Sequence, residues 1–266
     1  ILFSNERSQI IGGKLMQTIR IEEMNWPDIK EAINQGFTTV VFGIGSNEQH
    51  GPHLPTKTDT LIGDAIANKF ALKFKNTLQA PTINVGCSDH HISFAGTISY
   101  RSETLKAIIF DFVESLIKHG FKTIVLIPSH GGNFQITQQA IEELQQKHPE
   151  LKIVGYTDLF GLLEILSQLS ADFGVSKAEA GAHAGESEAS FMLSLSEDLV
   201  KKDRFVPGFV GEIGAEETQT IFEKGMPALT DNGILGDPRT ATKEKGAHYL
   251  EKIVDVLIEE IQKQLL

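Results

Sequence analysis

The sequence of 266 residues has little of several features that would indicate particular classes of protein. Cys87 is its one cysteine, so no intrachain disulfide can form, and a reducing compartment such as the cytoplasm is the expected location. Basic residues are outnumbered, and the formal net charge of −11 argues against nucleic acid or an anionic membrane surface as partners. Apolar runs of about 18 residues are absent, so no membrane-spanning helix is expected.

Nucleotide-binding and serine-hydrolase motifs are also incomplete. The Gly-Ile-Gly of residues 43–45 follows an apolar run, but Glu48 occupies the position where a dinucleotide-binding fingerprint has its third glycine. The Gly-Gly-Lys of residues 12–14 is followed by leucine, so it is not a phosphate-binding loop. A G-x-S-x-G nucleophile motif does not occur. A nucleotide-dependent oxidoreductase is therefore an unfavoured alternative.

Segments of strand character alternate with segments of helical periodicity along most of the chain. Apolar spacing and end signals predict strands at 38–44, 78–85, 122–128 and 151–156, and helices at 28–34, 60–74, 103–119 (with Ser102 as N-cap), 134–147, 159–169, 187–195 and 242–266. This alternation predicts an α/β fold with a mainly parallel sheet covered on both faces. Since no linker divides the chain, we expect one domain, 16–266, after an N-terminal extension, 1–15, that precedes the first methionine.

A short segment after the predicted strand 38–44 contains several metal-ligand residue types. Glu48 and His50 are two residues apart, so on an extended backbone their side chains share one face. Asp59 follows nine residues later, and its carboxylate could bridge two cations. Carboxylate and imidazole together suit divalent metals such as Zn or Mn. His53 lies between prolines, where we expect it to pack within the loop or support a ligand.

Two further segments supply the other half of such a site. His130 follows the strand predicted at 122–128, and Gly131 and Gly132 let the backbone approach a metal or substrate closely. His183 and Glu188 lie around the start of the helix predicted at 187–195. Ligands of open α/β sheets bind at the carboxyl ends of strands, where both the 48–50 and the 130 positions fall. We therefore expect the three segments to meet.

The charges of this set suit two divalent ions. Glu48, Asp59, Glu188 and a bridging hydroxide would offset four positive charges, with His50 and His130 as neutral ligands. A water shared by two ions loses its proton near neutral pH and becomes a nucleophile. His183 is not needed as a ligand, and it is our candidate for carrying a proton to a leaving nitrogen.

Other histidines and the cysteine have simpler explanations available. His90 and His91 could line a substrate pocket, and surface or packing roles are equally expected. Cys87 could act as a nucleophile, but a lone cysteine is usually a small buried hydrophobe. A metal-binding or assembly protein without turnover is the alternative from a different class, and the presence of every acidic ligand and of His183 argues against it.

The motifs together resemble the creatininase family of amidohydrolases. The similar segments, in chain order, are Glu-Gln-His-Gly-Pro-His-Leu-Pro at 48–55 with Asp59, Phe-Ala-Gly-Thr-Ile-Ser at 94–99, His-Gly-Gly-Asn at 130–133, His-Ala-Gly-Glu-Ser-Glu at 183–188 and Gly-Asp-Pro-Arg at 236–239. The resemblance implies a three-layer α/β/α sandwich and two divalent metal ions per chain (Zn, Mn or Fe). It also implies a homo-oligomer, often a hexamer, and hydrolysis of a non-peptide amide C–N bond, cyclic or linear, such as that of the small molecule creatinine.

Site residues follow from the resemblance position by position. The family's metal ligands match Glu48, His50, Asp59 and His130, with Asp59 bridging, and His183 matches the residue assigned to proton transfer. Glu188 is the expected fifth ligand and a second catalytic candidate, and Glu186 is the alternative. Candidates for substrate binding are His91, Gly131, Gly132 and Asn133.

Two departures from creatininase proper bear on the substrate. Gly132 stands where creatininase has a glutamate ligand, and its lid tryptophans are missing, with Phe160 or Phe173 as possible replacements. A formamide deformylase acting on a ribosylaminopyrimidine and a small-peptide metallopeptidase are therefore alternatives within the family. A deformylase would need a phosphate pocket, for which the candidates are Arg101, Lys177, Arg204 and Arg239.

Overall fold

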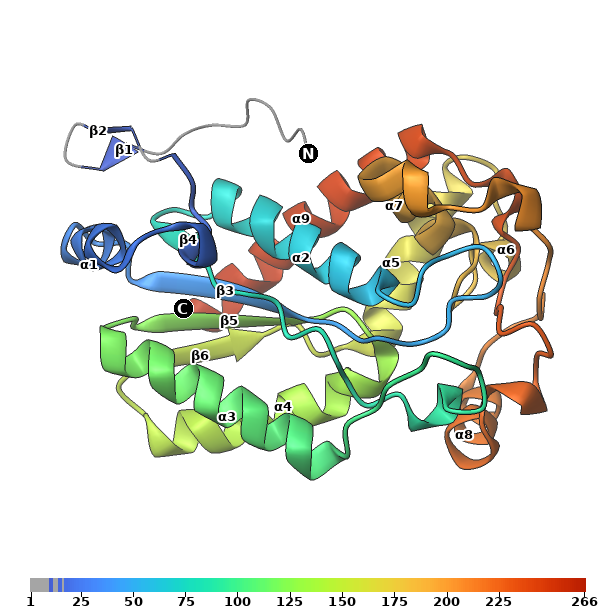
Figure 1. Cartoon of the computed structure of the whole chain (residues 1–266), viewed down its shortest axis with the longest axis horizontal. Coiled ribbons are helices and arrows are strands. Elements are labelled where there is room, and N and C mark those ends of the chain that lie inside the picture. Colours follow the sequence, from blue (N-terminus) through green and yellow to red (C-terminus); the bar gives the residue numbers. More distant parts are fainter. Residues whose placement is uncertain (1–9, 12–13, 16) are drawn as a thin grey trace.

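A four-stranded parallel sheet forms the centre of the molecule (Figure 1). The structure is a computed structural model that describes residues 10–11, 14–15 and 17–266. The strands lie in the order β4 (Thr77–Gln79), β3 (Thr39–Ile44), β5 (Thr123–Pro128) and β6 (Lys152–Gly155). A helix joins each strand to the next, and such crossover connections produce parallel pairing.

Helices cover both faces of this sheet. On one face lie α2 (Thr58–Lys73) and α9 (Lys243–Leu265), and on the other α3 (Ser102–His119) and α4 (Phe134–Lys147) (Figure 1). The strands are apolar along their length because both faces are buried, and most of β3 and β5 has no contact with solvent. The predicted three-layer α/β/α fold is confirmed.

The remaining elements lie around this core. They are α1 (Trp26–Asn34), α5 (Leu159–Ala171), α6 (Lys177–Ala180), α7 (Glu186–Ser196), α8 (Ala215–Lys224) and an antiparallel pair, β1 (Ile10–Ile11) and β2 (Lys14–Leu15). The helices α5 to α8 gather beyond the carboxyl ends of the strands (Figure 1). Among the described residues, none of the helices combines the length and the apolar character needed to cross a membrane.

Several boundaries differ from the predicted ones for local reasons. Pro81 has no N–H for the ladder, so β4 stops at Gln79, and Ile83 returns to β3 only through an isolated bridge with Ile44. Ser102 is the first residue of α3 rather than its N-cap. The short pair β1–β2 and helices α6 and α8 were not predicted. The extension predicted for 1–15 lies largely outside the described residues and stays a prediction.

Helix α2 begins two residues earlier than predicted. Asp59 therefore lies in its first turn, and not before it. A carboxylate is favoured there, since the first turn of a helix carries partial positive charge and free N–H groups. The early start also fixes the direction of Asp59, because a helical residue has less freedom than one in a loop.

Candidate metal centre

The predicted metal ligands lie together beyond the carboxyl ends of β3 and β5. Glu48 and His50 follow β3, Asp59 is in the first turn of α2, His130 follows β5, and Glu188 is in the first turn of α7. Segments up to 140 residues apart meet there because parallel strands end at a common edge.

Asp59 lies between two histidines. Its Oδ1 is 3.1 Å from Nε2 of His50, and its Oδ2 is 3.3 Å from Nδ1 of His130. Nε2 of His50 is also 3.7 Å from Oε2 of Glu188. Each oxygen of Asp59 thus faces a different imidazole, which is the arrangement of a carboxylate that can bridge two cations.

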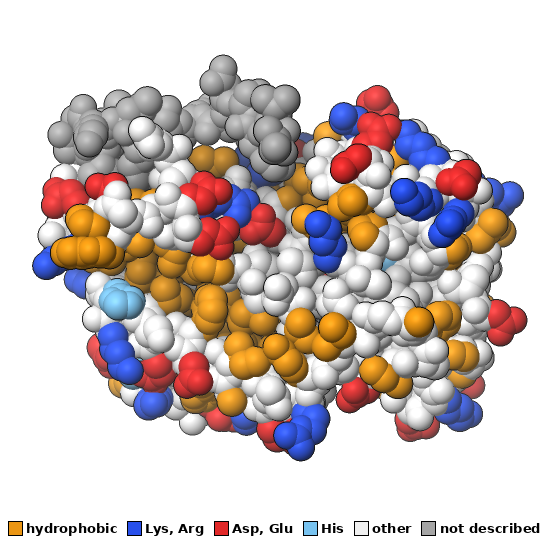
Figure 2. Space-filling view, in the orientation of Figure 1, with side chains coloured by type: hydrophobic (Ala, Val, Ile, Leu, Met, Phe, Trp, Pro, Cys, Tyr) orange, Lys and Arg blue, Asp and Glu red, His pale blue; other side chains and the backbone are white. Residues whose placement is uncertain are grey.

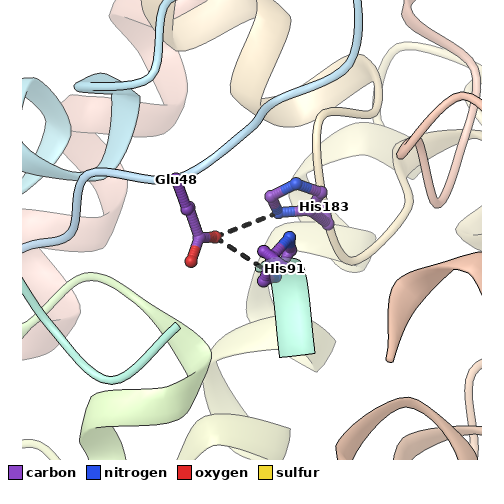
Figure 3. A group of neighbouring side chains, drawn as sticks. All are labelled: Glu48, His91 and His183. Atoms are coloured by element: carbon purple, nitrogen blue, oxygen red, sulfur yellow. Dashed lines mark ion pairs between the residues drawn. The ribbon is translucent and has the colours of Figure 1, made fainter. Parts of the chain in front are cut away.

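Glu48 is surrounded by the other histidines. Its Oε2 is 3.1 Å from Nδ1 of His130 and accepts a hydrogen bond from the Ser46 hydroxyl. Its Oε1 is 3.4 Å from Nε2 of His91 and 3.6 Å from Nδ1 of His183 (Figure 3). Glu48 is therefore the residue around which His91, His130 and His183 converge.

The histidine rings are oriented by backbone carbonyl groups. Nδ1 of His50 is 3.1 Å from the carbonyl oxygen of Glu48, and Nε2 of His130 is 2.9 Å from that of Cys87. Nε2 of His183 is 2.8 Å from the carbonyl oxygen of Gln49. In its neutral form, a ring that donates to a carbonyl through one nitrogen keeps a lone pair on the other, and here that other nitrogen faces the carboxylates.

Gln49 is a residue of the centre that the motif analysis did not select. Its Oε1 accepts from the N–H of Gly51, and its Nε2 is within hydrogen-bond distance of Nδ1 of His91 and of the Gly233 carbonyl. If the Gln49 amide donates to both, His91 carries its proton on Nε2, facing Glu48. Its position inside the 48–55 motif was the available signal, but its role depends on contacts with Gly233 and His91.

The carboxylates of the centre are buried with few partners. Glu48 and Asp59 are 0% and 2% exposed, and Oε1 of Glu48 and Oδ2 of Asp59 have no hydrogen-bond donor. Within the described residues, the basic side chains that pair with Glu48, Asp59 and Glu188 are all histidines. Buried carboxylates without lysine or arginine need compensation from protons or from cations.

The pKa values of two histidines and of Glu188 show that the buried carboxylates lack compensating charge. Burial opposes the charged form of His50, yet Asp59 and Glu188 outweigh it and raise its pKa to about 10. Glu48 and Asp59 likewise raise the pKa of His130 against burial. Burial raises the pKa of Glu188 to about 7, although His50 opposes the shift. Without cations, the centre therefore retains protons that a metal would displace.

The residues fit divalent metal ions. Donor atoms of Glu48, His50 and Asp59 lie within 4.8 Å of one another, as do those of His50, His183 and Glu188. Glu48 forms two further such groups, one with His91 and His183 and one with His90 and His130. The fold and the site together define an α/β protein with a centre suited to metal-dependent hydrolysis. The individual ligand assignments stay predictions.

Glu188 and Glu186 point to different places. Glu188 accepts a short hydrogen bond from the N–H of Ala184, whose backbone is left-handed at φ 52°. Such a conformation is costly for a residue with a Cβ, and here it turns the N–H toward the carboxylate. Glu186 is fully buried away from the centre, where it pairs with Lys245. The geometry favours Glu188 over Glu186 as the fifth ligand.

The substrate-binding candidates do not behave alike. Gly131 lines a cavity next to Glu188, and His91 lies at the centre. A Cβ on Gly132 would lie 2.1 Å from the Cys87 carbonyl oxygen, so this position accepts no side chain. Asn133 is fully buried, and its amide bonds the backbone of residues 44, 45 and 87. Asn133 therefore holds loops together and has no free group for a substrate.

Other candidates lie apart from the centre. His53 is buried against Phe205, and burial lowers its pKa to about 4, so it packs within the loop as a neutral ring. Phe160 is 55% exposed, and Phe173 packs on the rings of His248 and Tyr249. Lys177 pairs with Glu164 and Arg239 with Asp237, while Arg101 and Arg204 are exposed. Within the described residues, the cavity beside Glu188 is lined by neither the two phenylalanines nor the four basic residues.

Known proteins resemble the chain over nearly its whole length. The sequence model of the creatininase family, described as creatinine amidohydrolase, matches residues 22–261. A mycofactocin precursor peptide peptidase of Mycobacterium ulcerans (strain Agy99) is 30% identical over 233 residues, 85% of each chain. A creatinine amidohydrolase of Pseudomonas putida is 25% identical over 262 residues, 94% of this chain and 98% of the relative.

A solved structure agrees with these sequence matches. A mutant creatininase of the Zn–Zn type has a TM-score of 0.77 and 25% identity to this chain, and the match covers 94% of this chain and 99% of that one. The chain belongs to the creatininase family, as the motifs predicted. It is a metal-dependent amidohydrolase of that family.

Proposed function

We propose that this chain is a two-metal amidohydrolase that cleaves an amide bond in a short peptide. The two-metal part rests on Asp59, whose oxygens face His50 and His130 separately. Glu48, Asp59 and His130 would hold one ion, and His50, Asp59 and Glu188 the other. Two divalent cations supply the charge that polarises an amide carbonyl and acidifies a water molecule.

His183 would move the proton of this reaction. Burial and the nearby His50 hold its pKa well below the ordinary value, so its ring is neutral at pH 7. Because Nε2 donates to the Gln49 carbonyl, Nδ1 carries the free lone pair. Nδ1 can accept a proton from the attacking water and pass it to the departing nitrogen.

A peptide substrate is supported by the relatives and by the surroundings of the centre. A relative with 30% identity is named as a peptidase of a precursor peptide. The phenylalanines considered as replacements for the lid tryptophans lie outside the cavity beside Glu188, and so do the four basic residues considered for phosphate binding. These positions favour a peptide over creatinine and over a phosphorylated formamide.

Creatinine hydrolysis is the second candidate function. It is favoured by the match to creatinine amidohydrolase, which extends over 98% of that relative. Both candidates use the same metal centre and differ only in the shape of the substrate.

Elemental analysis combined with activity assays would test the proposal. Protein purified without added metal should contain near two ions of Zn, Mn or Fe per chain, and it should hydrolyse short peptides faster than creatinine or a formamide. Faster turnover of creatinine would favour the second candidate. If the protein binds no metal even after Zn or Mn is supplied, the two-metal proposal is wrong.

We also propose that the chain forms a homo-oligomer, with a hexamer expected. Figure 2 shows apolar side chains gathered across the middle of one face, with charged side chains around them. An apolar patch with a polar rim is typical of a protein–protein contact. Light scattering of the purified protein should give a mass several times that of one chain, and a mass of 29.2 kDa would contradict this proposal.

A further inference from the structure

An apolar cavity adjoins the metal centre. It has a volume of about 90 Å³ and extends from Gly131 and Glu188 into the space between α2, α5 and α9. Leu162, Leu163 and Leu166 of α5 form one wall. Glu188 is the one charged side chain in the wall, among the described residues.

Glu188 connects this cavity with the metal centre. Its side chain is 19% exposed, compared with 1% for Glu48 and 2% for Asp59. The carboxylate of Glu188 therefore has one side toward His50 and another toward the cavity. A substrate whose amide lies at the centre can place a neighbouring group in the cavity.

The size and chemistry of the cavity limit what that group can be. An apolar cavity of about 150 Å³ is large enough for benzene, so this smaller one suits a branched aliphatic group. A charged side chain would lose its hydration there without gaining a partner. Leu162 and Leu163 are only half-buried, so an aliphatic group in contact with them would remove more apolar surface from water.

We propose that this cavity binds an aliphatic side chain of the substrate, of valine to leucine size, on a residue that forms the cleaved amide bond. This inference rests on the proposed peptidase function, because it assigns specificity to the same centre. The helix α5 is then the specificity element of the enzyme, and Leu163 is a specificity-determining residue.

Two series of tripeptides would test the inference on the metal-loaded protein. Each series varies one residue beside the cleaved bond among Gly, Ala, Val, Leu and Asp. In one series, kcat/KM for the Leu peptide should exceed that for the Ala peptide by about 10-fold or more, since a single methylene in such a pocket contributes about 10-fold discrimination or more. The peptide with Asp at the varied position should be the poorest substrate of that series.

Variants of α5 link the preference to the cavity. Leu163→Trp should fill the cavity and lower kcat/KM for the Leu peptide by a larger factor than for the Ala peptide, which removes the preference for Leu. Phe160→Ala is the matched control on the same helix, because Phe160 is exposed and outside the cavity, and it should keep the preference. If Leu163→Trp does not fold, Leu162→Ala should instead enlarge the cavity and shift the preference from Leu toward Phe.

Binding of amino-acid hydroxamates separates this inference from the proposed function. Calorimetry should give tighter binding for leucine hydroxamate than for glycine hydroxamate, and Leu163→Trp should remove the difference. If this holds but no peptide is hydrolysed, the cavity inference stands and the peptidase proposal fails. If peptides are hydrolysed without any dependence on side-chain size, the peptidase proposal stands and the cavity inference is wrong.

Discussion

Glu186 and Glu188 are two residues apart in the first turn of α7, and their surroundings are opposite. Glu186 has a full set of partners. It pairs with Lys245 at 3.2 Å and accepts hydrogen bonds from hydroxyl groups of Ser170, Ser190 and Tyr249. Glu188 has one backbone N–H and a histidine.

This difference separates a carboxylate with structural partners from a candidate metal ligand. The partners of Glu186 come from α5, α7 and α9, so its charge joins three helices. Glu188 shares its surroundings with Glu48 and Asp59, and that group has more negative charge than its partners neutralise. A protein tolerates such a surplus where a cation is to bind. Four predictions test the comparison.

Asp59→Asn should have the largest effect. An asparagine side chain has only one oxygen that can act as a metal ligand. It therefore cannot present one oxygen toward His50 and another toward His130, as the Asp59 carboxylate does. Since even residues that only orient ligands change metal affinity or activity by about 10- to 100-fold, we expect a loss of kcat/KM of more than about 100-fold. Elemental analysis should also show fewer than two metals per chain. An unchanged metal content would contradict the bridging role.

Glu188→Gln should come next. It removes a ligand from one subsite only, so we expect about one metal per chain and a loss of activity of about 100-fold. Because burial raises the pKa of Glu188 to about 7, its ionisation destabilises the metal-free fold as the pH rises from about 4.5 to 7. The variant lacks this ionisation. Urea denaturation at pH 8 should therefore find metal-free Glu188→Gln more stable than the wild type.

Glu186→Gln should give the reverse pattern. Removing one partner of a buried pair leaves Lys245 uncompensated, so the free energy of unfolding should fall by about 3 kcal/mol, while metal content stays at the wild-type value. The double variant Glu186→Gln, Lys245→Met is the control, since it removes both charges and should recover much of the loss. If the single variant loses metal without losing stability, Glu186 and Glu188 have been assigned the wrong roles.

The sequence predicted the fold well because each strand is a compact apolar run between helical segments. The end of β4 was predicted too late because the apolar stretch continues past Pro81, although a proline inside such a stretch is itself a signal that the ladder stops. Helix α8 has few apolar residues and packs on residues 89–91 and 226–228, so its own pattern is weak. Elements held by tertiary contacts rather than by periodicity were therefore the ones missed.

The residues of the site were more predictable than their roles. Spacing placed Glu48, His50 and Asp59 near one another, because they lie within one short segment. It could not decide between Glu186 and Glu188, since the choice depends on Lys245, which is about 60 residues away. Gly132 is similar, because the groups that exclude a side chain there, the Cys87 carbonyl and the His130 ring, are known only from the structure.

The smallest expected effect concerns the protons that the negative charge of the carboxylates keeps bound in the metal-free centre. The pKa of His50 is raised to about 10, that of His130 is also raised, and that of Glu188 is raised to about 7. At pH 7 the metal-free centre therefore holds protons on both histidines and partly on Glu188. A metal ligand must be deprotonated, so binding of Zn at pH 7 should release these protons and the affinity should rise with pH up to about 10.

Calorimetry of Zn binding in two buffers of different ionisation enthalpy measures this proton release. The wild type should release more than one proton per chain on filling both subsites, and Glu188→Gln should release fewer, because it lacks the group that is half-protonated near pH 7 and is expected to bind about one metal. Glu186→Gln is the matched control and should release as many protons as the wild type, since Glu186 pairs with Lys245 away from the metal centre. Equal release by all three proteins would mean that Glu188 is already ionised in the metal-free centre, and its contrast with Glu186 would then rest on geometry alone.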